Sequence, residues 1–316
     1  MVTPLKDLGK DAIAVKGWFG AHKWLLLRRA TQVGILVLFL IGPWAGLWLL
    51  KGNLAASTVL DTVPLTDPLL VLQMLAAGFV GLASTALLGA AIVAVFYVLV
   101  GGRAYCSWVC PVNIVTDGAH WLRRRLDIRQ SARLKPSARW WMLGLTLVVS
   151  AATGTLAFEL VNPVSMLHRG LIFGIGIGWA VIAAIFLFDL FVARHGWCGH
   201  LCPMGAFYGL LGSASLVRVR ADGRDNCDDC MECYEVCPEP QVIPPAVKSA
   251  AAGGSPVILS GACTNCGRCI DICPNDVYAF GLRGRALVTP RPLPADHPRN
   301  SAPGFASNVQ DDRKIA

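Results

Sequence analysis

The sequence predicts a polytopic α-helical membrane protein followed by a small α+β domain. Three observations lead to this fold class: the chain is unusually apolar, its first two thirds contain long runs without Lys or Arg, and its last third carries regularly spaced cysteines. Hydrophobic residues make up 54% of the 316 positions and charged residues only 15%, whereas soluble domains carry about 25% charged residues. The composition therefore argues against an ordinary soluble protein.

Four apolar segments are long enough to cross a bilayer, which takes about 20 mostly apolar residues. They are residues 31–50, 71–100, 140–160 and 171–193, and none of them contains Lys or Arg. We expect four transmembrane helices there, in a membrane domain that covers residues 31–213.

Basic residues predict the orientation of these helices, because Lys and Arg concentrate in cytoplasmic loops. Residues 1–30 hold six Lys or Arg and residues 101–139 hold eight, whereas the two other loops hold one each, Lys51 and Arg169. We therefore expect a multi-pass protein of the bacterial inner membrane. Its N-terminus, its central loop and its C-terminal third would lie in the cytoplasm.

The basic segment 1–30 precedes the first expected helix and contains Arg28-Arg29. Such a pair before an apolar run also occurs in twin-arginine secretion signals. The run here is long and strongly apolar, which fits an uncleaved first helix better than a signal peptide. Aromatic residues among the basic ones predict that this segment lies along the inner membrane surface.

Eight of the twelve cysteines form two copies of one motif near the end of the chain. CDDCMECYEVCP begins at Cys227 and CTNCGRCIDICP begins at Cys263, and both read C-x2-C-x2-C-x3-C-P. This is the spacing of bacterial two-cluster ferredoxins, in which the fourth thiolate of each run binds the other [4Fe–4S] cluster. The predicted ligands of cluster 1 are Cys227, Cys230, Cys233 and Cys273, and those of cluster 2 are Cys263, Cys266, Cys269 and Cys237.

Zinc and disulfides explain these cysteines less well. Structural zinc sites usually use two separated C-x2-C pairs, which leaves the repeated fourth cysteine and proline without a role. Disulfides are rare in the reducing cytoplasm. We therefore expect a two-[4Fe–4S] ferredoxin domain at residues 214–290, followed by a disordered tail at residues 291–316 that is rich in Pro, Asp and Asn.

The four remaining cysteines lie in two copies of C-x3-C-P, each after an expected helix that returns to the cytoplasm. YCSWVCP contains Cys106 and Cys110, and WCGHLCP contains Cys198 and Cys202. Residues four apart share one face of a helix, and a twofold axis along the membrane normal would bring the four sulfurs together. Four sulfurs suit an iron–sulfur centre or zinc. A redox dithiol, a contact with a partner and simple packing of buried Cys remain alternatives.

The combination of four helices, two C-x3-C-P motifs and a two-cluster ferredoxin domain resembles the NapH family, over about residues 20–285. Members of this family are membrane quinol dehydrogenase components of periplasmic nitrate reductase systems. MauN of methylamine utilisation and the membrane cores of NosR and FixG are related to it. The first outer loop is too short for the flavin domain of NosR, and the tail is too short for the C-terminal domain of FixG. MauN is similar in size and plan.

The resemblance implies a protein that oxidises quinol and passes electrons through [4Fe–4S] clusters toward a periplasmic reductase, first of all the nitrate reductase. It also implies a periplasmic NapG-like ferredoxin-type partner. It gives no reason to expect a nucleic-acid partner. The alternatives are a MauN-like electron-transfer role and an assembly or maturation factor for a metalloenzyme.

The sequence does not identify the quinol pocket or any catalytic residue, and it leaves open whether the chain is itself an enzyme. Cytoplasmic clusters and a periplasmic acceptor are separated by a bilayer of about 30 Å. The implied role therefore requires either an additional redox centre at the C-x3-C-P motifs or electrons from cytoplasmic donors.

Overall fold

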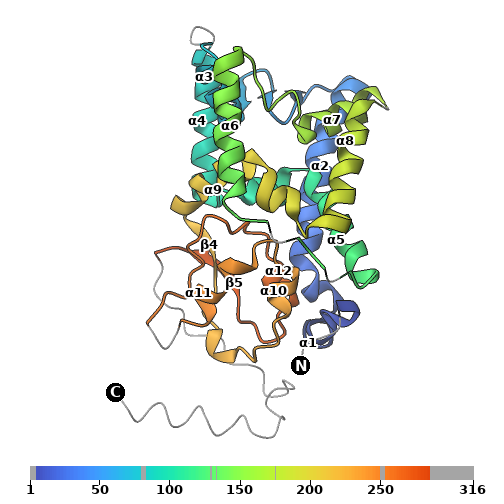
Figure 1. Cartoon of the computed structure of the whole chain (residues 1–316), viewed down its shortest axis with the longest axis vertical. Coiled ribbons are helices and arrows are strands. Elements are labelled where there is room, and N and C mark those ends of the chain that lie inside the picture. The colour runs from blue at the N-terminus through green and yellow to red at the C-terminus, as the bar shows by residue number, and fades with distance from the viewer. Residues whose placement is uncertain are drawn as a thin grey trace, which may run out of the picture.

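A computed structural model describes residues 5–79, 83–128, 130–132, 134–174, 176–249 and 253–284. A set of long helices stands above a smaller lobe that contains the C-terminal cysteines (Figure 1). The described N-terminal residues lie at the lower end, beside that lobe. We call the upper part the helical domain and the lower part the ferredoxin lobe.

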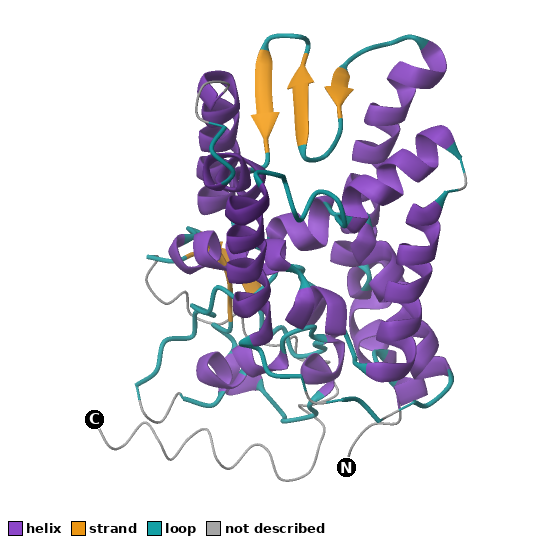
Figure 2. Cartoon of the chain, turned by 45° about the horizontal axis from the view of Figure 1, so that its top comes forward, coloured by secondary structure: helices purple, strands orange, loops and turns teal. Residues whose placement is uncertain are grey.

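The helical domain contains nine described α-helices and a small sheet. The helices are α1 (Lys10–Ala21), α2 (Lys23–Ala45), α3 (Pro68–Ala76), α4 (Ala83–Val100), α5 (Val112–Arg125), α6 (Ala138–Thr153), α7 (Pro163–Phe173), α8 (Ile177–Leu187) and α9 (Pro203–Ala214). Strands β1 (Leu50–Gly52), β2 (Ala56–Val59) and β3 (Val63–Thr66) form an antiparallel sheet at the upper end (Figure 2). Five-residue π-helical turns cover Tyr105–Val109, Phe188–Val192 and Trp197–Leu201.

The apolar segments form shorter helices than we expected. Among the described residues, one helical run, Lys10–Ala45, is long and apolar enough to cross a bilayer, and Thr85–Val100 and Ile177–Val192 are shorter apolar helices. Four uninterrupted transmembrane helices are therefore not confirmed.

Two prolines and a glycine mark boundaries of these shorter helices. Pro68 and Pro163 each begin a new helix, because proline lacks the N–H that a helix interior needs but fits the first turn. Gly154 ends α6 with a φ of 64°, a left-handed conformation that glycine adopts without strain. The third expected helix therefore stops before residue 160, and the chain turns back into the domain.

The order of elements is repeated within the helical domain. A long helix is followed by a short helix beginning at proline, an apolar helix, a π-helical turn with C-x3-C and a further helix, first in α2–α5 and again in α6–α9. The short helices are capped in the same way. Asp67 accepts a hydrogen bond from the Leu69 amide at 3.0 Å, and Asn162 accepts one from the Val164 amide at 3.0 Å.

The ferredoxin lobe contains short elements around its own apolar core. Its strands β4 (Val217–Arg220) and β5 (Ala279–Leu282) pair antiparallel, and its α-helices are α10 (Glu232–Val236), α11 (Pro244–Val247) and α12 (Arg268–Ile272). Single 3-10 turns cover Arg224–Asn226 and Pro240–Val242 in this lobe, and a further 3-10 turn, Leu5–Asp7, precedes α1. The core includes Val219, Ile243, Ile258 and Val277.

Candidate iron–sulfur sites

The eight cysteines of the ferredoxin lobe surround two cavities in the combination that the sequence predicts. Cys227, Cys230, Cys233 and Cys273 line one cavity. Cys237, Cys263, Cys266 and Cys269 line the other. Each cavity takes three thiols from one motif and the fourth from the other motif. All twelve cysteines, which lie in the described part of the chain, are free thiols.

The two C-x2-C turns have the same backbone conformation. The residues before and after the second cysteine have positive φ angles: Asp229 and Met231 in the first motif, and Asn265 and Gly267 in the second. Positive φ is uncommon outside glycine, and Asn and Asp tolerate it best. The sequence repeat is therefore also a repeat of backbone geometry, and it leads into α10 and α12, which carry the third cysteines.

The donor set of both cavities fits an iron–sulfur cluster. Among the described residues, no three His, Cys, Asp or Glu side chains converge closely enough for a single metal ion. A zinc ion needs four sulfurs about 2.3 Å from one centre, whereas a [4Fe–4S] cluster takes one thiolate on each of its four irons. Burial raises the pKa of Cys230 to about 12 and that of Cys233 to about 11, so binding of a cluster releases thiol protons.

The four cysteines of the C-x3-C-P motifs line one further cavity, which we call the four-thiol site. It is surrounded by Tyr105, Cys106, Cys110, Val112, Phe158, Asn162, Pro163, Val164, Trp197, Cys198, Cys202 and Met204. Both halves of the helical domain contribute to it. Cys106 and Cys198 lie in π-helical turns rather than in α-helical turns, and Cys110 and Cys202 directly follow these turns in an extended conformation. Such single turns are frequent at functional sites.

Tyrosines that the sequence analysis did not single out lie beside the four-thiol site. The ring of Tyr105, next to Cys106, stacks on Tyr208 at 4.8 Å with an interplanar angle of 8°, and Tyr97 packs edge-on against both. The Tyr208 hydroxyl donates to Asp67 Oδ1 at 3.2 Å. Aromatic rings therefore connect the four-thiol site with the start of α3.

Arg103 connects the four-thiol site to the cavity of cluster 2. Its Nη1 donates to Glu239 Oε1 at 2.5 Å and to the Ala262 carbonyl at 2.8 Å, and its Nη2 donates to the Cys198 carbonyl at 2.9 Å. Glu239 follows Cys237 by two residues, and Ala262 directly precedes Cys263. One guanidinium therefore contacts the backbone of both sites.

Further contacts hold the first C-x3-C-P turn against the cluster 2 loop. Ser107 Oγ donates to the Thr264 carbonyl at 2.7 Å, and Trp108 Nε1 donates to the Asn265 carbonyl at 2.9 Å. At Gly261 in the same loop, an added Cβ would overlap the Gly209 carbonyl oxygen of α9. The close approach therefore requires glycine at position 261.

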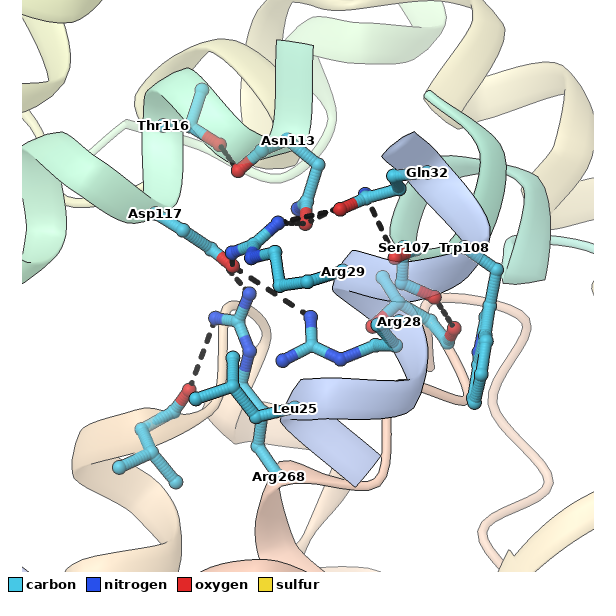
Figure 3. A network of polar contacts seen from close by, with 12 residues as sticks. Leu25, Arg28, Arg29, Gln32, Ser107, Trp108, Asn113, Thr116, Asp117 and Arg268 are labelled. Atoms are coloured by element: carbon cyan, nitrogen blue, oxygen red, sulfur yellow. Dashed lines mark hydrogen bonds and ion pairs between the residues drawn. The ribbon is translucent and has the colours of Figure 1, made fainter. Parts of the chain in front are cut away.

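An ion-pair network joins α2, α5 and α12 (Figure 3). Asp117 pairs with Arg29 and with Arg268, and the Arg28 Nη1 atom lies 3.6 Å from its Oδ2 atom. Burial alone would raise the pKa of Asp117, but Arg268, Arg28 and Arg29 more than offset this effect and hold the pKa well below its usual range. Asp117 is therefore a carboxylate at every physiological pH.

The sequence analysis missed Arg103, Glu239 and Asp117 as structural links, although one signal was available. Arg103 lies between a long apolar run and the first C-x3-C-P motif. A charge in such a place needs a buried partner. Sequence alone does not show that the partner is Glu239, 136 residues away.

Comparisons with known proteins agree with these sites. A family model described as "4Fe-4S binding domain" matches residues 82–129 and 172–221, and one described as "4Fe-4S dicluster domain" matches residues 226–277. The first of these includes both C-x3-C-P motifs. No solved structure matches the chain.

The chain is also similar to several curated ferredoxin-type proteins over most of its length. It is 54% identical to the methylamine utilization ferredoxin-type protein MauN of Methylorubrum extorquens, over 88% of this chain and 95% of MauN. It is 50% identical to the ferredoxin-type protein NapH of Escherichia coli, over 90% of this chain and 98% of NapH. With NapH of Haemophilus influenzae it shares 47% identity, over 90% of this chain and 98% of that protein. The protein is therefore a ferredoxin-type electron-transfer protein and belongs to the NapH and MauN family.

Proposed function

We propose that this protein oxidises quinol at the bacterial inner membrane and passes the electrons through [4Fe–4S] clusters toward a periplasmic reductase. The eight cysteines of the ferredoxin lobe are the ligands of cluster 1 and cluster 2, and the four-thiol site holds an additional iron–sulfur centre. The N-terminus and the ferredoxin lobe lie on the cytoplasmic side. A NapG-like ferredoxin-type partner accepts the electrons on the periplasmic side.

The observation that carries this proposal is the direct connection between the cluster 2 cavity and the four-thiol site. Arg103, Ser107 and Trp108 all donate hydrogen bonds across this boundary. A bilayer of about 30 Å is too thick for a single electron transfer. A redox centre in the four-thiol site divides that distance into shorter electron-transfer steps. The tyrosines beside this site extend from it toward α3.

When bound, each [4Fe–4S] cluster accepts and returns one electron. The chain holds the thiolates of its sites at fixed positions through the paired left-handed turns and the π-helical turns. Arg103 is buried between the two sites and places positive charge beside their thiolates. That charge favours thiolate over thiol and stabilises added negative charge.

Anaerobic membranes that contain the protein test the proposed function. Addition of a quinol should produce the electron paramagnetic resonance signal of reduced [4Fe–4S] clusters, and dithionite should define the full signal. Clusters that dithionite reduces and quinol does not would contradict quinol oxidation.

The reductase that receives the electrons has two candidates. The NapH resemblance favours the periplasmic nitrate reductase, and 54% identity to a MauN protein favours an acceptor in methylamine utilisation. Deletion of the gene should abolish either growth with nitrate as the electron acceptor or growth on methylamine. The acceptor enzyme should remain fully metallated but unreduced in the deletion strain, whereas an assembly or maturation factor would leave it without its metal centre.

A further inference from the structure

We propose that a cavity between the N-terminal helices and the ferredoxin lobe is the binding site for the quinol head group. The proposal rests on the function proposed above and adds the place where quinol binds. The cavity has a volume of about 430 Å³, and its walls come from α1, α2, α5, α10 and α12. Ligand pockets commonly have volumes of about 300–1,000 Å³. The cavity falls within this range and is large enough for a quinone ring.

The cavity has the mixed lining that a quinol head group requires. Leu25, Ile114 and Ile272 provide apolar surface, and Arg28 and His120 provide polar groups. A quinol has a flat apolar ring with an oxygen at each end. Its ring needs apolar walls, and its buried oxygens need hydrogen-bond partners.

Arg28 is a buried group in this cavity with unused hydrogen-bonding capacity. Its side chain is 1% exposed, and within the described residues its Nε and Nη1 atoms donate no hydrogen bond. The carboxylate of Asp117 lies 3.6 Å from Nη1 (Figure 3). Buried polar atoms are rarely left without partners, so the free donors of Arg28 indicate a ligand oxygen. Its positive charge also favours loss of a proton from a bound quinol.

His120 is a second polar group without a partner. Both ring nitrogens lack a hydrogen-bond partner among the described residues, and the side chain is 7% exposed. Burial, together with Arg124 and Arg194, lowers its pKa to about 3. The ring is therefore neutral at pH 7, and one of its nitrogens is free to accept a hydrogen bond.

The cavity lies directly against the helix that carries a ligand of cluster 2. Arg268, Asp271 and Ile272 of α12 line the cavity, and the same helix contains Cys269. An α-helix is about 10 Å in diameter, so one helix separates a bound quinol from cluster 2. Val236, which precedes Cys237, is also part of the wall.

The position of the cavity on α2 agrees with a membrane-dissolved ligand. Asp271 accepts hydrogen bonds from the amides of Trp24 and Leu25 at 3.1 and 2.9 Å, which fixes the beginning of the apolar α2 on the ferredoxin lobe. The cavity therefore opens near the inner end of that helix. Trp121 lines it and is 53% exposed, as tryptophans at a membrane interface are.

The reaction balances with the groups present. Oxidation of one quinol to quinone releases two electrons and two protons. The electrons go to cluster 1 and cluster 2, one to each. The protons leave the two quinol oxygens for water at the open side of the cavity, while the neutral His120 ring accepts a hydrogen bond from one of these oxygens.

The test compares two phenylalanine substitutions on the same helix. Ala12 is fully buried and lines the cavity, whereas Ala14 is exposed and does not line it. Ala12→Phe should reduce the rate at which menadiol, a naphthoquinol, reduces the clusters of the full-length protein by about tenfold or more, equivalent to at least about 1.4 kcal/mol. Ala14→Phe should leave the rate at the wild-type level, and dithionite should reduce all three proteins fully.

Labelling with a photoactivatable azidoquinone gives a readout of binding that does not depend on the clusters. The label should attach to peptides from α1, α5 or α12 in the wild type and in Ala14→Phe, and should be lost in Ala12→Phe. If Ala12→Phe does not assemble, His120→Gln replaces it and should also slow reduction by menadiol.

The outcomes separate this inference from the proposed function. A wild-type protein that menadiol does not reduce contradicts quinol oxidation itself. A wild type that menadiol reduces, with an equal rate in the cavity variant and labelling elsewhere, overturns the cavity as the quinol site. A phospholipid that native mass spectrometry detects in the wild type and not in Ala12→Phe, at unchanged rates, would assign the cavity to a lipid instead.

Discussion

Arg103 and Glu239 form a buried ion pair, with 2.5 Å between Nη1 and Oε1 and side-chain exposures of 1% and 2%. The pair joins the loop before the first C-x3-C-P motif to the segment after Cys237. Arg139 of α6 reaches the same carboxylate oxygen at 2.8 Å. Both halves of the helical domain are therefore attached to the ferredoxin lobe at a single carboxylate.

Glu239→Gln removes this carboxylate and keeps the volume of the side chain. Two buried guanidiniums then lack a counter-charge, and breaking a buried pair in this way costs about 3–5 kcal/mol. Denaturant titration should show this decrease in the free energy of unfolding. Protease should also cleave the variant near residue 239 faster than it cleaves the wild type. The control is Asp61→Asn, which breaks the exposed Lys51–Asp61 pair and should cost less than about 1 kcal/mol. Equal losses in both variants would contradict a structural role for Glu239.

Gly261→Ala should loosen the ferredoxin lobe, because the added Cβ overlaps the backbone of α9. Gly144→Ala in α6 is the matched control, since a Cβ there meets no atom within 4 Å. Removing a helical glycine should stabilise the protein by about 0.5–1 kcal/mol. The midpoint temperature of thermal unfolding should therefore fall for Gly261→Ala and rise for Gly144→Ala. A Gly261→Ala protein as stable as the wild type would show that the α9 contact is looser than described.

Asp117→Asn should destabilise the protein by an amount that does not vary between about pH 5 and pH 8. The pKa of Asp117 is lower in the folded protein than its unfolded value of about 3.9. Its stabilising contribution is therefore fully present above the unfolded pKa and is lost as the pH falls through the folded pKa. Comparing the unfolding free energies of wild type and variant at several pH values tests this. A difference that changes between pH 6 and pH 8 would mean that another group controls the network.

Reporter fusions test the proposed orientation. Green fluorescent protein at the C-terminus should fluoresce, and alkaline phosphatase at the same position should be inactive. Alkaline phosphatase inserted between β1 and β2 should be active, because that sheet is at the opposite end of the helical domain (Figure 2). An active phosphatase at the C-terminus would place the ferredoxin lobe in the periplasm and would contradict the proposed orientation.

The cysteine motifs predict which thiols lie together, because the spacing of ligands is local, and cluster binding by these thiols stays a prediction. The exchange of fourth cysteines between two adjacent motifs follows from the motif itself, and Cys237 and Cys273 lie in the expected cavities. The helices were less predictable. Hydropathy shows where a chain is apolar, but it does not show that Gly154 ends a helix inside the third segment or that Pro68 and Pro163 begin separate short helices. The links through Arg103 and Asp117 depend on contacts between residues more than 80 positions apart, which no local pattern encodes.

The most direct test of the central claim, a redox centre in the four-thiol site, is the iron and sulfide content of a Cys106→Ser, Cys198→Ser double variant. The variant keeps all eight cysteines of the ferredoxin lobe. With three [4Fe–4S] clusters in the wild type, it should lose about one third of its iron and sulfide, together with one component of the electron paramagnetic resonance spectrum. Unchanged iron and an unchanged spectrum would contradict a centre at this site.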